Sequence, residues 1–103
     1  MRYILAILWI TTAYAGEQSI QWDDNSQHED GFKVYRGIDG KDFKEIGKTA
    51  KNITKFTDKD VPLGVIVSYR VTAYSNKWGE TKPSNTLNVS TILEAPSNLR
   101  KAQ

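Results

Sequence analysis

VIVSYRVTAY, residues 65–74, is the stretch of sequence that decides the fold of this chain. Its apolar residues Val67, Tyr69, Val71 and Ala73 alternate with polar ones, and successive side chains of a β-strand point to opposite faces. The alternation therefore predicts a half-buried β-strand, with one face on a hydrophobic core and the other in solvent.

The same period of two recurs on both sides of this stretch. It is present in SIQW (residues 19–22) and in GFKVYRG (residues 31–37), and further apolar positions follow at Phe43, Ile46 and Phe56. Polar segments rich in turn-forming residues separate these strands, at residues 23–31, 38–41, 59–64, 75–80 and 82–85. No stretch after residue 15 keeps a helical apolar face over three turns. The pattern predicts an all-β fold, an antiparallel sandwich or barrel of six to seven short strands.

One of these turns is specific enough to predict its own geometry. Both central residues of a type I′ hairpin need a positive φ angle, and the pair Asp39-Gly40 is among those that adopt it most readily. We therefore expect a tight hairpin between a strand ending near Arg36 and a strand containing Phe43 and Ile46.

Composition limits the chain to one domain and argues against several kinds of function. The 103 residues are 39% hydrophobic, enough for a single core. The 14 basic and 12 acidic residues are interspersed and give a net charge of +2, well short of the basic stripe that a nucleic-acid partner requires. There is no cysteine, which excludes disulfides, thiolate metal sites and cysteine nucleophiles.

The first fifteen residues are typical of an export signal. Met1-Arg2 provides a positive start, Tyr3 to Ile10 is an unbroken apolar run, and Ala13-Tyr14-Ala15 places small residues where a signal peptidase cleaves. The alternative is a membrane anchor, but eight apolar residues are far fewer than the ~20 that cross a bilayer. The sequence thus predicts a signal peptide at 1–15 and a mature chain from Gly16 with no membrane span. We expect that chain to be secreted, periplasmic or on the extracellular surface.

Several separate motifs resemble those of the fibronectin type III domain family, an immunoglobulin-like β-sandwich. They occur in the family's order and cover about residues 18 to 92: Ile20-x-Trp22, Gly31-Phe32-x-Val34-Tyr35-Arg36, Tyr69-x-Val71-x-Ala73-Tyr74, Gly79-Glu80 and Pro83-Ser84-Asn85. The resemblance implies that Trp22 is the core tryptophan of the second strand. It also implies that the last strand runs through Leu87, Val89 and Thr91, and it places the domain at residues 16–93.

The chain departs from the family at two places. Val67 occupies the position where we expect a tyrosine whose hydroxyl bonds back to the chain, so the turn around Pro62-Leu63-Gly64 is predicted to be looser than usual. The family's first strand is also missing before residue 18. Instead, the C-terminal tail, residues 94–103, contains Ala95-Pro96-Ser97-Asn98-Leu99-Arg100, which looks like the start of that strand.

Three fates are open to this tail. It can be a disordered remnant of a longer array, fold back on its own domain, or complete a neighbouring molecule head to tail through residues such as Pro96, Asn98 and Leu99. Three residues, 93–95, reach at most ~10 Å, less than the ~17–20 Å length of a typical strand. The tail therefore cannot enter its own domain in the family's strand direction.

No arrangement of residues predicts catalysis. His28 is the only histidine, no serine, histidine and aspartate set is evident, and no glycine-rich phosphate loop occurs. Asp23, Asp24, Glu29 and Asp30 could offer oxygen ligands to calcium, but their spacing does not fit an EF-hand loop, and a solvated loop is the simpler interpretation. The sequence therefore predicts no enzyme, no cofactor and no metal site.

Trp78 is the leading candidate for partner binding, together with its neighbours Lys77 and Asn76 in the loop between the last two predicted strands. An exposed tryptophan offers a flat apolar face to a sugar ring or a protein pocket, although the indole could instead cover the core as a lid. We therefore predict a secreted, non-enzymatic binding or adhesion module whose partner is a protein or carbohydrate at a surface. The alternative is a self-assembling structural subunit that decorates a virion or cell surface by C-terminal strand donation.

Overall fold

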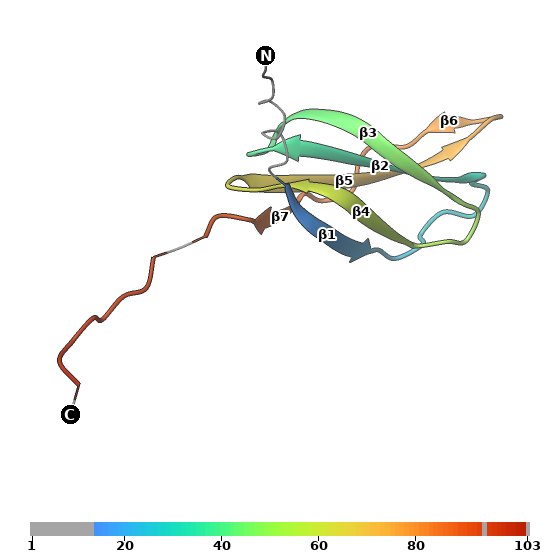
Figure 1. Ribbon diagram of the computed structural model, residues 1–103. Coiled ribbons are helices and arrows are strands. Elements are labelled where there is room, and N and C mark those ends of the chain that lie inside the picture. The colour runs from blue at the N-terminus through green and yellow to red at the C-terminus, as the bar shows by residue number, and fades with distance from the viewer. Residues whose placement is uncertain (1–13, 94, 103) are drawn as a thin grey trace, which may run out of the picture.

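The chain folds into two facing antiparallel β-sheets (Figure 1), as seen in a computed structural model that describes residues 14–93 and 95–102. Most of the predicted signal peptide lies outside the described residues. The seven strands are β1 (Tyr14–Gln21), β2 (Gly31–Ile38), β3 (Lys41–Ala50), β4 (Lys55–Pro62), β5 (Ile66–Ser75), β6 (Gly79–Glu80) and β7 (Leu87–Ser90). The predicted all-β antiparallel sandwich is confirmed. Residues 14–93 and 95–102 include no helix with the length and apolar character of a membrane span.

The strands divide unequally between the sheets. β1 and β4 form a two-stranded sheet, and the other sheet has the order β3-β2-β5-β6, with β7 also paired to β5. Between β6 and β7, Thr81 and Ser84 bond to β5 partly through their side chains: Val71 N donates to Ser84 Oγ (3.0 Å) and Ala73 N donates to Thr81 Oγ1 (3.1 Å). The predicted last strand is present as Leu87–Ser90, and Thr91 lies just beyond it.

The core forms where the alternating residues of β5 meet the facing sheet. Val67, Tyr69, Val71 and Ala73 are all buried, as are Phe32 and Val34 of β2 and Ile20 and Val61 of the opposite sheet. Trp22 follows β1 directly and packs edge-on against Phe32, with ring centroids 5.5 Å apart. The period of two thus identified the core face of β5 correctly.

The other face of β5 is more buried than the alternation predicted. Ser68 and Thr72 are also buried, because β5 lies in the centre of its sheet and polar neighbours cover both hydroxyls. Ser68 Oγ accepts from Gly40 N (2.8 Å) and donates to Asn88 Oδ1 (2.7 Å). Hydrogen bonds of this kind offset the cost of removing the two hydroxyl groups from water.

The predicted Asp39-Gly40 hairpin is confirmed. Asp39 has a φ of 53° and Gly40 a φ of 74°, and Ile38 pairs with Lys41 across the turn. The strand before the turn continues to Ile38, two residues beyond the expected end, because β2 pairs with β5 along its whole length.

Tyr69, not residue 67, supplies a buried tyrosine hydroxyl near the corner between β4 and β5, and it bonds to a side chain of β4 and not to the turn at residues 62–64. Tyr69 is 1% exposed, and its hydroxyl donates to Asp58 Oδ2 at 2.7 Å. Arg36 Nη1 lies 2.9 Å from both oxygens of Asp58 and also donates to Asp60 O (3.1 Å). A buried carboxylate therefore ties β2, β4 and β5 together.

Candidate functional site

The turn between β5 and β6 is held in one conformation by its own hydrogen bonds. Ser75 Oγ accepts from the backbone N–H groups of both Lys77 and Trp78, each at 3.1 Å. Gly79 follows with a φ of 95°, a conformation that L side chains rarely adopt. The backbone of Trp78 is therefore fixed by its neighbours.

A second set of bonds ties this turn to the segment between β1 and β2. Asp30 Oδ2 accepts from Asn76 N at 2.6 Å, and Asp30 N donates to Tyr74 O at 2.7 Å. Within the segment, Ser26 N donates to Asp24 Oδ1 at 3.0 Å. Two loops that are far apart in sequence thus form one connected surface at this end of the sandwich.

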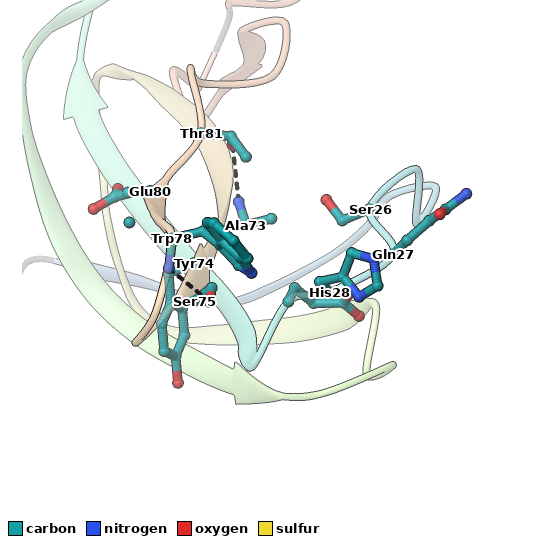
Figure 2. A pocket seen from close by; sticks show the side chains of 11 residues that line it. Ser26, Gln27, His28, Ala73, Tyr74, Ser75, Trp78, Glu80 and Thr81 are labelled. Atoms are coloured by element: carbon teal, nitrogen blue, oxygen red, sulfur yellow. Dashed lines mark hydrogen bonds between the residues drawn. The ribbon is translucent and has the colours of Figure 1, made fainter.

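A hollow of about 330 Å³ lies between the two loops. Figure 2 shows Trp78 on one side of it and Ser26, Gln27 and His28 on the other. The side chain of Trp78 is 70% exposed, so it does not cover the core in the way a lid would. The hollow therefore combines one large aromatic surface with several polar side chains.

Of the three residues that the sequence predicted for partner binding, only one lines the hollow. Trp78 lines the hollow, whereas Lys77 and Asn76 do not. Lys77 Nζ lies 4.9 Å from the centroid of the Trp78 ring, within the range of a cation–π contact. Asn76 acts through its backbone N–H, which bonds to Asp30. Lys77 thus packs on the aromatic side chain, and Asn76 stabilises the turn.

Glu80 belongs to the lining of the hollow, but its carboxylate points away from Gln27 and His28 (Figure 2). Its carboxylate accepts hydrogen bonds from the hydroxyl of Tyr35, from Thr72 Oγ1 (2.7 Å) and from Lys33 Nζ (3.3 Å). These donors, Tyr35 above all, lower the pKa of Glu80 below its ordinary value. Glu80 is therefore ionised at neutral pH, and its carboxylate ties β6 to β2 and β5.

The acidic residues of the 23–30 segment do not gather into a metal site. No group of three or more histidine, cysteine, aspartate or glutamate side chains suited to a metal ion occurs in the described part of the chain. Asp24 and Asp30 instead accept hydrogen bonds from backbone N–H groups, as given above. Glu29 is buried.

The tail residues predicted for strand donation lie far from this hollow. Pro96, Asn98 and Leu99 belong to a segment that has no secondary structure and extends away from the sandwich (Figure 1). The side chain of Leu99 is fully exposed. These residues therefore make a separate candidate site.

Sequence reasoning missed Glu80 and Tyr74 as parts of the hollow. Both lie on strands, where alternation indicates only that a side chain faces outward. Their approach to the 26–29 segment depends on Asp30 bonding across to the β5–β6 turn. The one available signal was the adjacency of Gly79-Glu80 to Trp78.

Comparisons with known proteins give a fold relationship only. No protein-family model matches the chain, and no curated protein sequence matches it. Among solved structures, a β-1,2-glucanase from Parabacteroides distasonis is similar, with a TM-score of 0.64 and 23% sequence identity. The match covers 82% of this chain but only 12% of the glucanase. This chain therefore has the fold of one small part of that much longer protein.

Proposed function

We propose that this protein is a non-enzymatic binding module of the fibronectin type III kind that recognises a carbohydrate through the hollow beside Trp78. The observation that carries the proposal is a tryptophan side chain, 70% exposed, on a turn whose backbone is held by hydrogen bonds. Exposing an indole costs hydrophobic free energy, and a rigid aromatic surface loses little entropy when a partner binds.

The chemistry around the indole suits a sugar ring. The apolar face of a sugar stacks on an aromatic side chain, while its hydroxyl groups need hydrogen-bonding partners at the ring edge. Gln27 and His28 offer amide and imidazole groups there, and Ser26 adds a hydroxyl. A volume of about 330 Å³ lies at the small end of ligand sites and fits one or two sugar units.

A β-1,2-gluco-oligosaccharide is the first probe to use, because the structural neighbour is a β-1,2-glucanase. Oligosaccharides with β-1,3 and β-1,4 linkages serve as comparators, and isothermal titration calorimetry measures the affinity. We expect Trp78→Ala to weaken binding at least tenfold and Trp78→Phe to retain part of it. Leu63→Ala is the matched control, since Leu63 is also exposed but lies in the β4–β5 turn.

Two outcomes would contradict the proposal. One is a glycan affinity that Trp78→Ala leaves unchanged. The other is binding to none of the oligosaccharides by a folded protein whose Trp78 engages a protein partner instead.

The proposal also places the mature chain outside the cytoplasm, as the export signal predicts. β1 begins at Tyr14, so cleavage before Gly16 would remove only its first two residues. Mass spectrometry of the protein exported by an expressing cell tests this, and we expect Gly16 at the N-terminus. An intact Met1 on exported protein would contradict it.

A further inference from the structure

The two-stranded sheet leaves one edge of β1 without a partner among the described residues. Trp22 N donates to Thr54 O at 3.1 Å, so the backbone groups of Trp22 point toward the strand β4. Those of Ile20, two positions earlier, point the same way. By alternation, the backbone N–H and C=O groups of Ser19 and Gln21 point outward. In agreement, Gln18 Nε2 donates to Ser19 O at 3.0 Å. β1 therefore directs strand-pairing groups outward, and the side chain of Gln18 occupies the carbonyl of Ser19 where no strand is paired.

This edge borders an opening that reaches the core. A hollow of about 160 Å³ lies between the end of β1 and the 84–87 segment, and its lining includes Ile20, Trp22, Tyr69 and Leu87. Trp22 Nε1 is buried and has no hydrogen-bond partner in the described part of the chain. An added strand would cover apolar side chains and bring carbonyl groups close to an indole that lacks an acceptor.

The C-terminal tail carries exposed apolar side chains that such a strand would bury, although Asn98, with a φ of 57°, must become extended to pair. Its described residues lie outside any strand and extend away from the sandwich (Figure 1). Leu93 and Leu99 are 96% and 101% exposed, more than any other large apolar side chain among the described residues. Apolar side chains held in water on an extended segment favour burial against another surface.

The tail leaves the domain at the wrong end to complete its own β1 in the antiparallel direction. Tyr14, at the start of β1, pairs with Pro62, and Thr91 Oγ1 donates to Pro62 O at 2.8 Å. The tail therefore begins beside the start of β1, whereas an antiparallel partner must enter at its end. The eight residues of β1 span about 26 Å at 3.3 Å each, a distance that would consume most of the tail.

We propose that residues 95–101 of a second copy of this chain add an antiparallel strand to the free edge of β1. Leu99 is the apolar anchor that packs beside Ile20. In this direction the end of the tail, with Arg100 and Lys101, approaches the first half of β1, where Glu17 is exposed. Each copy has one donor and one acceptor, so the contact is heterologous and propagates head to tail.

Two variants separate the donor from the acceptor. Leu99→Asp places a charge on the anchor and leaves the domain unchanged. Ser19→Pro blocks the edge, because proline lacks the outward N–H and edge strands tolerate it. Ala102→Asp is the matched control, adding the same charge beyond the anchor. Circular dichroism establishes that each variant keeps the β-sheet spectrum, and Gln21→Pro replaces Ser19→Pro if that variant is unfolded.

Analytical ultracentrifugation of the mature chain, residues 16–103, provides the test. We expect wild type and Ala102→Asp to form species of two or more chains as concentration rises, and each blocked variant to stay monomeric. Mixing the two blocked variants leaves one donor and one acceptor, so a one-to-one complex and nothing larger should form. A monomeric wild type up to about 1 mM would overturn the proposal, as would equal masses for wild type and Leu99→Asp. These results do not depend on glycan binding.

Discussion

Replacing Tyr69 with phenylalanine tests whether the buried carboxylate of Asp58 holds the two sheets together. The ring of Tyr69 keeps its place in the core, but Asp58 Oδ2 loses a donor at 2.7 Å. A hydrogen bond to a charged group contributes about 1.5–3 kcal/mol, and Asp58 is only 4% exposed, so water cannot replace the hydroxyl easily. We expect unfolding to become easier by about 2 kcal/mol, which lowers Tm by roughly 8–16 °C for a domain of this size.

The same contact predicts how stability depends on pH. Burial raises the pKa of Asp58, but hydrogen bonds from Arg36, Tyr69 and the backbone of Asp60 outweigh burial and leave that pKa below its ordinary 3.8. This stabilisation is therefore present above pH 3.8 and is lost as pH falls through the lower pKa of the folded state. Burial and the bond to Asp58 raise the pKa of Tyr69 far above its ordinary 10.0. Its stabilisation is present below pH 10 and is lost as pH rises beyond that value.

Urea unfolding, followed by tryptophan fluorescence from pH 2 to 11, measures both effects. Tyr35→Phe is the matched control, because its hydroxyl also donates to a carboxylate, that of Glu80, but near solvent. That change should cost at most about 1 kcal/mol. The difference between wild type and Tyr69→Phe should be largest between pH 5 and 9. Equal losses from the two tyrosine variants, or a Tyr69→Phe difference that stays constant with pH, would refute the role of Asp58.

Two further substitutions test the backbone of the fold and of the site. A Cβ on Gly31 would lie 2.1 Å from Thr49 O, whereas one on Gly64 meets nothing within 4 Å and is strained only by its φ of 77°. Gly31→Ala should therefore lower the free energy of unfolding by roughly 2–3 kcal/mol and Gly64→Ala by about 1 kcal/mol, as measured by thermal unfolding. A larger loss for Gly64→Ala than for Gly31→Ala would contradict the packing of β2 against β3. Asp30→Ala removes the acceptor of Asn76 N, so hydrogen exchange at that amide should accelerate at least tenfold. Unchanged protection there would show that Asp30 does not hold the turn.

Much of the fold could be predicted from the sequence, because burial on one face leaves a period of two. Val67, Val71 and Ala73 are buried as the alternation indicates, and the two positive φ angles at Asp39-Gly40 follow from the residues themselves. The burial of Tyr69 was predicted correctly, but the hydrogen bond that its hydroxyl makes was not predicted. Its partner, Asp58, lies on another strand of the opposite sheet, and alternation carries no information about which polar groups meet there.

Less of the candidate site could be predicted. Trp78 was identified because it lies in the predicted loop between the last two strands, where an exposed indole offers a flat apolar face to a partner. Lys77 and Asn76 were grouped with Trp78 only because they are its neighbours in sequence. In the structure Lys77 packs on the indole, and the backbone of Asn76 holds the turn. The far wall, which includes Gln27 and His28, faces Trp78 because Asp30 bonds across the gap, a contact between positions 46 residues apart.

Nuclear magnetic resonance of the isotopically labelled protein, titrated with β-1,2-gluco-oligosaccharide, tests the proposed carbohydrate site most directly. The indole N–H signals of Trp22 and Trp78 provide an internal comparison, since one belongs to the core and the other to the hollow. We predict that the Trp78 signal moves, together with backbone signals of residues 26–29 and 73–81, while the Trp22 signal stays in place. Saturable movement that is confined to residues outside the hollow and leaves Trp78 unchanged would contradict the account.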